Sequence, residues 1–198
     1  LFLALGKRGV YFWSMEPPGF LGKINPPGRA VEVEVKDERI FVANSEGSLY
    51  VFDLSSDTSV KLMRFPSVRS PVSLSLRDTL IFLAEREEGI DIIKFSNDSL
   101  SMLNHIDTRG ECWRVAFMDH YAFVADGTMG LKVLNIKNPY KPKVLCQLKL
   151  QGAARDLVIW GDKAYLASLS VGIIEVDIKK PRHPEVLGVL QEPRMPTR

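Results

Sequence analysis

The chain has 198 residues, 45% hydrophobic and 25% charged, so it is long enough to bury a core as one domain or two small ones. Lys and Arg total 26 and Asp and Glu total 24, without a block of either sign, which argues against a nucleic-acid or acidic-membrane binder. No apolar stretch approaches the roughly 18 residues of a membrane span, and the first residues lack the features of a signal peptide. Because the chain begins with Leu1, we expect an excerpt of a longer protein.

An internal repeat of about 41 residues runs along the whole chain. A small anchor residue recurs at spacings of 39, 41, 41 and 42 residues, as Ala4, Ala43, Ala84, Ala125 and Ala167. Five residues later comes a glycine, except in the second copy, where Gly47 is one step early; the others are Gly9, Gly89, Gly130 and Gly172. An apolar segment follows each time, beginning at Val10, Leu49, Ile90, Leu131 and Ile173. Such a repeat over almost the whole chain predicts one structural unit used five times.

Each repeat unit is predicted to contain four short strands. In the clearest copy they cover about 113–118, 120–126, 130–136 and 143–150, with turn residues between them. The third junction carries a turn-forming proline or aspartate in every copy, namely Pro18, Asp57, Asp98, Pro139 and Pro181. Apolar residues recur at period two or in short β-branched runs, so no amphipathic helix of useful length is expected and the chain should be all-β.

A four-stranded repeat of this length is typical of a β-propeller blade, which buries both faces against its neighbours. We expect four full blades at 28–69, 70–110, 111–152 and 153–198, and a partial one at 1–27 that lacks its innermost strand. The polar tail from Gln191 cannot supply that strand, so we expect the chain to be part of a larger ring within a single propeller domain. Open end blades would make the isolated chain dimeric or aggregation-prone.

The segment YAFVADGTMGLKVLNIKNPYKPKVL, residues 121–145, resembles the LVIVD repeat. Residues 163–187 match the same pattern through Asp177, Pro181 and Pro184, although Ser168 and Leu169 replace its Asp-Gly pair. The earlier copies keep only the alanine, the glycine region and the strands. This resemblance implies a β-propeller, often secreted or attached to a bacterial or archaeal surface, and implies a fold more than an activity.

A candidate binding site follows from one polar position near the start of each first strand, where propellers usually bind ligands. The position holds Glu32, Ser73, Arg114 and Asp156. Trp113 and Arg155 precede two of these residues, and Asp126 lies in an adjoining loop. We expect this face to bind a peptide, a glycan or a small ligand. The alternative is that Glu32, Arg114 and Asp156 pair with one another and with channel water, which mixed-sign neighbours favour.

Metal, cofactor and disulfide chemistry have little support in the sequence. His105, His120 and His183 share no metal-ligand spacing, so no metal or cofactor is expected. Asp126-Gly127 and the acids Glu85, Glu87 and Glu88 could hold calcium, but turn chemistry and a solvated loop explain them better. Cys112 and Cys146, on the innermost and outermost strands of one blade, should lie roughly 14 Å apart as buried free thiols.

Seven strand aromatics are assigned to the core: Tyr11, Phe12, Trp13, Phe52, Phe95, Phe123 and Trp160. The leading functional hypothesis is a non-enzymatic binding or scaffold module of a larger exported or cell-surface protein, with a protein or glycan partner. An alternative is a lactonase- or glycosidase-type hydrolase in which Glu32 and Asp156 are the only candidate acids and other catalytic residues lie outside this chain. A third possibility is a surface-layer element whose outer strands, such as 143–150, contact neighbours.

Overall fold

The computed structural model describes residues 1–53, 63–66 and 69–190, so the predicted turn residue Asp57 and the tail from Gln191 lie outside the described residues. The described residues form strands, turns and connecting segments, which confirms the predicted all-β class. None of them belongs to a helix long and apolar enough to cross a membrane. The chain forms two compact units.

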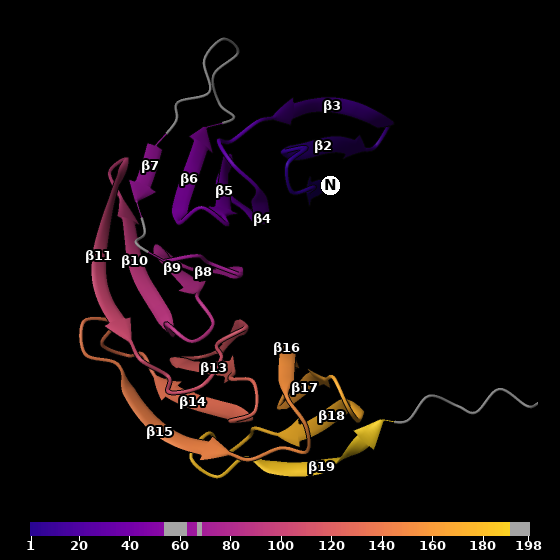
Figure 1. Cartoon of the computed structure of the whole chain (residues 1–198), viewed down its shortest axis with the longest axis vertical. Helices are drawn as coiled ribbons and strands as arrows, with labels where there is room; N and C mark the ends of the chain where they lie inside the picture. The colour runs from indigo at the N-terminus through magenta and orange to yellow at the C-terminus, as the bar shows by residue number, and fades with distance from the viewer. Residues whose placement is uncertain (54–62, 67–68, 191–198) are drawn as a thin grey trace, which may run out of the picture. The chain divides into compact units, whose positions relative to one another are not determined.

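The first unit, Leu1–Glu85 and Ile90–His105, contains three antiparallel sheets (Figure 1). The first sheet has three strands, β1 (Phe2–Ala4), β2 (Val10–Met15) and β3 (Pro18–Ile24). The second has four: β4 (Ala30–Lys36), β5 (Arg39–Asn44), β6 (Ser48–Asp53) and β7 (Met63–Pro66). The third contains β8 (Ser73–Arg77), β9 (Leu80–Ala84), β10 (Ile90–Ser96) and β11 (Ser99–Ile106). Anchor Ala4 ends β1, so this sheet holds the second to fourth strands of a blade.

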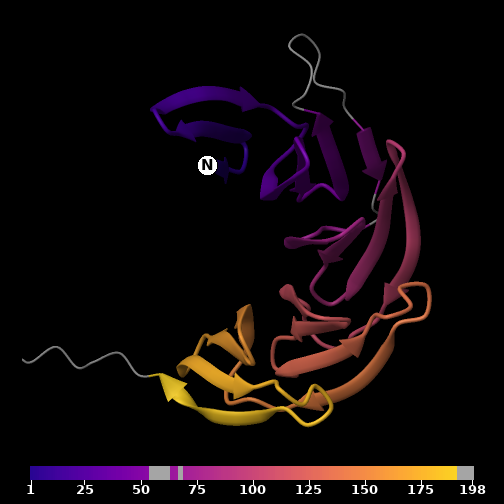
Figure 2. The same ribbon diagram turned by 180° about the vertical axis from the view of Figure 1, so that it is seen from behind.

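The second unit, Arg86–Gly89 and Ile106–Arg198, contains two four-stranded antiparallel sheets, seen from the other side in Figure 2. One consists of β12 (Arg114–Met118), β13 (Tyr121–Ala125), β14 (Leu131–Asn135) and β15 (Lys143–Leu148). The other consists of β16 (Ala154–Trp160), β17 (Lys163–Ser168), β18 (Gly172–Asp177) and β19 (Glu185–Leu190). In every sheet the strands pair in chain order. The four strands predicted around Ala125 are therefore present at nearly the expected bounds.

Both faces of an inner sheet are apolar because each face packs against another sheet of the same unit. In the first unit, Val42 lies in the core shared with β1–β3, whereas its neighbour Phe41 lies in the core shared with β8–β11. This alternation follows from the period of two along a strand. In the second unit, Phe123 and Leu166 belong to the core between the two sheets. Continuous apolar strands such as Ile40–Ala43 therefore need no polar face.

Trp160 does not lie in the core, contrary to its assignment from the sequence. Its side chain is 79% exposed, whereas Phe52 and Phe123 are buried and the other four assigned aromatics are half-buried. Trp160 and Val158 alternate with the buried Leu157 along β16, so they point to the opposite face of the last sheet. Val158 is exposed as well, because none of the described residues covers that face.

Candidate functional site

The polar residues predicted near the start of the first strands contact the neighbouring first strand of the same unit. In the first unit, Glu32 Oε2 accepts a hydrogen bond of 2.7 Å from the Leu74 backbone N–H, beside the buried Ser73. In the second unit, Arg114 Nε lies 3.4 Å from Asp156 Oδ1. In both cases the residue on one first strand contacts the first strand of the following sheet. The pairing alternative thus describes the contact of Arg114 with Asp156, whereas Glu32 contacts a backbone N–H of the next sheet.

The predicted aromatic, Trp113, lies immediately before β12 and is the centre of a group of polar side chains. The Cζ atoms of Arg86 and Arg155 lie 4.6 Å and 3.9 Å from its ring centroid, well within cation–π range. Its Nε1 donates to Glu111 Oε2 over 3.4 Å, and Arg155 Nη2 lies 3.5 Å from the same oxygen. Arg155 is therefore held by both the indole ring and a carboxylate.

The backbone places these side chains through two short bridges between loops and strands. Arg86 and Cys112 exchange backbone hydrogen bonds of 3.0 Å and 2.9 Å, which set Arg86 beside the residue preceding Trp113. Gly127 bonds in the same way to Ala154, the residue before Arg155. Gly127 has φ of +59°, and a Cβ there would lie 2.9 Å from the Glu111 side chain, so only glycine fits without displacing that carboxylate.

We call the set Arg86, Glu111, Trp113, Arg114, Arg155 and Asp156 the Trp113 surface. Arg86 is exposed, the side chain of Asp156 is 67% exposed, and the other members are partly exposed. Its three arginines and two acids leave one net positive charge. This surface can stack a planar group and donate hydrogen bonds to a carboxylate or a backbone carbonyl. The sequence pattern identified four members, Trp113, Arg114, Arg155 and Asp156, and missed Arg86 and Glu111.

Asp126, also predicted as a ligand-binding residue, lies inside its blade. Its side chain is fully buried, and Oδ2 lies 2.7 Å from Lys132 Nζ. Lys132 also donates to the Thr108 carbonyl, so its ammonium has two buried acceptors. The carboxylate of Asp126 is therefore turned to Lys132 as part of a buried ion pair, while its neighbour Gly127 supports the Trp113 surface.

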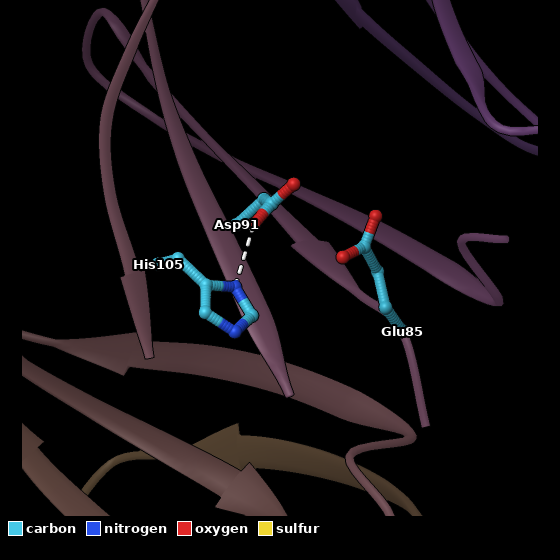
Figure 3. Close-up of side chains that lie close together, drawn as sticks. All are labelled: Glu85, Asp91 and His105. Carbon is cyan, nitrogen blue, oxygen red and sulfur yellow. Dashed lines mark hydrogen bonds and ion pairs between the residues drawn. The ribbon is translucent and has the colours of Figure 1, made fainter. Parts of the chain in front are cut away.

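Glu85, Asp91 and His105 form a third group of side chains that lie close together in the structure and that the sequence did not predict (Figure 3). Glu85 follows β9, Asp91 lies on β10 and His105 on β11. His105 Nδ1 lies 2.8 Å from Asp91 Oδ1, and the possible ligand atoms of all three residues lie within 4.8 Å of one another. Histidine spacing along the chain could not reveal this group, because it is assembled across three strands. The three side chains thus offer ligand atoms that could hold a metal ion.

The two cysteines are free thiols, as predicted, although only Cys112 is fully buried. Cys146 is half-buried, and its Sγ donates to the Pro181 carbonyl over 3.3 Å. Partial burial raises the pKa of the Cys146 thiol, which keeps it protonated and poorly nucleophilic. Neither cysteine offers a reactive group to a candidate site.

The LVIVD repeat model matches residues 27–65, 109–146 and 151–190, which together exceed half of the chain. No curated protein sequence shows significant similarity. Solved structures with a similar fold include the designed protein Ika8, with a TM-score of 0.72 and 13% identity over 94% of this chain and 57% of Ika8.

Two natural propellers are similar in the same way. The β-propeller domain of Myceliophteria thermophila Cps50 (Swd1) has a TM-score of 0.76 and 12% identity, with 96% of this chain and 69% of that one covered. The WD40 β-propeller domain of Doa1 has a TM-score of 0.71 and 15% identity, with 98% and 65% covered. The chain thus spans less than two thirds of Ika8 and of the Doa1 domain. These similarities show a β-propeller fold.

Proposed function

Because this chain belongs to the LVIVD-repeat family and has a β-propeller fold, we propose that it is a non-enzymatic binding module that takes a peptide segment of a partner protein at the Trp113 surface. The observation that carries the proposal is the contact of two guanidinium groups, of Arg86 and Arg155, with one indole ring. Tryptophan and arginine are the residues most enriched at binding hot spots.

The surface is suited to a peptide because its side chains are already held in place. The backbone N–H of Trp113 donates a 2.8 Å hydrogen bond to the Ala125 carbonyl at the end of β13, its indole Nε1 donates to Glu111, and Arg155 is paired with Glu111 as well. A ligand therefore loses little free energy in ordering these groups. The net positive charge favours an acidic segment, whose carboxylates would receive the arginine N–H donors.

A hydrolase function has less support, because both of its candidate catalytic acids already take part in hydrogen bonds or an ion pair. Glu32 Oε2 accepts the Leu74 N–H, and Asp156 Oδ1 accepts the Leu157 N–H at 2.8 Å and faces Arg114. Both carboxylates therefore have a clear part in joining adjacent first strands. We propose no catalytic role for them.

Self-association through the last sheet is a further part of the proposal. Val158, Trp160 and Ile173 are exposed on its outer face, and exposed apolar patches of this kind favour association. Light scattering should show a dimer or larger species for the chain and a smaller mass for Val158→Lys. A parent chain that is monomeric at all concentrations would contradict this part.

An extracellular or cell-surface location and a possible glycan partner also belong to the proposal, and they are supported by the family resemblance. Labelling of intact source cells with a membrane-impermeant reagent should modify the protein. Protection of the protein until the cells are lysed would place it inside and contradict the location.

The peptide proposal is tested by selecting binders from a phage-displayed library of linear peptides and measuring their affinities by calorimetry. Trp113→Ala should weaken binding by about 30-fold or more, the loss typical of a hot-spot tryptophan. Arg86→Ala, which alters an exposed side chain, should weaken it as well and keeps the test valid if Trp113→Ala fails to fold.

Trp160→Ala is the matched control, because it removes another exposed tryptophan of the same unit from a different face. It should leave the affinity unchanged. Selected peptides that bind the Trp113→Ala chain as well as the parent, or that lose binding equally in Trp160→Ala, would overturn the proposal. Selection of glycans but no peptides from parallel arrays would overturn the peptide assignment.

A further inference from the structure

The group Glu85, Asp91 and His105 combines the features of a metal site. Glu85 comes directly after β9, while Asp91 and His105 lie on β10 and β11, and Figure 3 shows their side chains converging on one region. Glu85 and Asp91 are almost completely buried, whereas His105 is partly exposed. One side of the group is thus enclosed by the blade, and the other can be reached from solvent.

A comparison with the next blade along the chain shows why this group is unusual. Glu85 and Asp126 each follow an anchor alanine, and Asp91 and Lys132 each come seven residues after one. In one blade the two positions therefore hold an acid and a base, 2.7 Å apart and buried. In the other they hold two acids, which need a cation nearby because unpaired buried charges are strongly unfavourable.

A second observation points to a ligand. The Oδ2 atom of Asp91 is buried and accepts no hydrogen bond from the described residues, although the Asp91 side chain is only 1% exposed. Its Oδ1 is the atom that faces His105 and lies 3.3 Å from Arg69 Nη1. Asp126 Oδ1 in the next blade of the chain is also buried without a donor, but Asp91 in addition has a second acid and an imidazole close by, and together these call for an explanation such as an ion.

Arg69 supplies part of the positive charge that the two acids require, and it competes with any metal. Its Nη1 contacts Asp91, and its Nε lies 4.0 Å from Glu85 Oε2. Since the Arg69 side chain is 29% exposed, the guanidinium can swing into solvent and leave the two carboxylates to a divalent ion. One divalent ion balances two carboxylates completely, whereas one arginine balances only half of their charge.

We propose that Glu85, Asp91 and His105 form a binding site for a divalent transition-metal ion of the zinc type. An imidazole with two carboxylates is a ligand set that zinc accepts. With bond lengths of about 2.1 Å, the ligand atoms of a tetrahedral zinc lie about 3.4 Å apart, so the three residues, whose possible ligand atoms lie within 4.8 Å of one another, would have to move closer by up to about 1.4 Å. If Nδ1 of His105 ligates, its proton moves to Nε2 or to solvent. The ion would join β9, β10 and β11 and leave a fourth position for water.

The test is calorimetric titration of the metal-free 198-residue chain with Zn²⁺, together with the absorption spectrum of bound Co²⁺. The proposal expects one ion per chain, with a Co²⁺ spectrum that lacks thiolate charge transfer. His105→Ala and Asp91→Asn should each lower the affinity at least about tenfold, because even outer-shell partners contribute that much. Arg69→Gln should raise it about tenfold, since it removes the competing cation.

His120→Ala and His183→Ala are the matched controls, because these histidines lie outside the group. Both should keep the parent affinity. His105→Ala changes a partly exposed residue, so it keeps the test falsifiable if Asp91→Asn fails to fold. Absence of a stoichiometric site, or a site abolished by a control variant and retained in His105→Ala, would overturn the proposal. An unchanged or lower affinity in Arg69→Gln would contradict the exchange of arginine for metal.

Discussion

Two blades of this chain place different charges at the same two buried positions. In residues 111–152, Asp126 and Lys132 form an ion pair of 2.7 Å that is closed to solvent. In residues 70–110, Glu85 and Asp91 occupy the equivalent positions, and the positive charge comes from outside the pair, from Arg69 and from His105 when it is protonated. The difference shows that the same two positions of the repeat can hold an internal ion pair in one blade and two acids in another.

A third position of the repeat also differs between these two blades. The residue fifteen before the anchor is a glycine in three full blades, Gly28, Gly110 and Gly152, and is Arg69 in the fourth. Each of these glycines lies against the polar side chain that follows the anchor: a Cβ on Gly110 would lie 2.6 Å from the Asp126 carboxylate. In the blade that holds Asp91 at the seventh position after the anchor, the chain thus has an arginine where the other three full blades have a glycine.

The largest effect should come from breaking the internal pair with Lys132→Met. This change leaves Asp126 as an uncompensated buried charge, which costs about 3–5 kcal/mol of unfolding free energy. Urea unfolding measures it. The double variant Asp126→Leu with Lys132→Met should recover most of the loss, and a Lys132→Met chain as stable as the parent would show that the pair contributes nothing.

A smaller loss is expected for Gly110→Ala, which adds a methyl group at the position where the other blade has Arg69. The Cβ would lie too close to the Asp126 carboxylate, and the resulting overpacking should cost about 1–3 kcal/mol. Gly161→Ala has no atom within 4 Å of the new Cβ, so it controls for crowding, although its positive φ adds strain of its own. Similar urea midpoints for Gly110→Ala and the parent would contradict the close approach.

The variant Arg69→Gln tests the positive charge that Arg69 places beside Glu85 and Asp91 in residues 70–110, and it is measured after zinc has been removed. We expect a loss of about 1–2 kcal/mol, between the values for exposed and buried ion pairs, because Arg69 is partly exposed. Thermal unfolding with and without zinc provides the measurement. Addition of zinc should restore the lost stability, and Arg77→Gln, which changes another partly exposed arginine of the same unit, near Asp78, is the control.

The smallest effect should come from a partly exposed pair in the last sheet, Lys163 and Glu175, whose Nζ and Oε1 atoms lie 2.6 Å apart. The hydrogen bond from Lys163 lowers the pKa of Glu175 below 4.5, and the same bond raises the pKa of Lys163 above 10.5. A lowered acid pKa stabilises the fold above pH 4.5, and this contribution disappears as the pH falls through the lower folded value. The lysine contribution is present below pH 10.5 and disappears at higher pH.

Glu175→Gln should therefore unfold slightly more easily than the parent between these limits, and the two should converge in acid. Urea unfolding at several pH values measures the difference. Glu185→Gln, another exposed acid of the same sheet, should follow the parent curve throughout. A difference that persists unchanged into strong acid would contradict the ion-pair explanation.

Local features were predictable because they depend on neighbours in the sequence. Strands β12–β15 follow from alternating or continuous apolar runs between turn residues, and the anchor alanine located every blade. Trp113, Arg155 and their neighbours were found because the start of a first strand is a repeated position. Trp160 was misplaced because strand aromatics are buried only where a second sheet covers them, and the strand pattern does not reveal which face is covered.

By itself, the sequence determined the all-β class, the blade repeat and the order of strands within each sheet, since these follow from short-range patterning and turn chemistry. Only the tertiary structure decided which polar side chains meet. Asp126 and Lys132 form an ion pair across one hairpin. Arg86 lies over the Trp113 ring, although the two residues are far apart in the sequence. His105 lies close to Glu85 and Asp91, which belong to other parts of the same sheet. The electrostatic partner of a charged side chain depends on distance in space. The repeat predicts which positions come close together, but not which residue types occupy them.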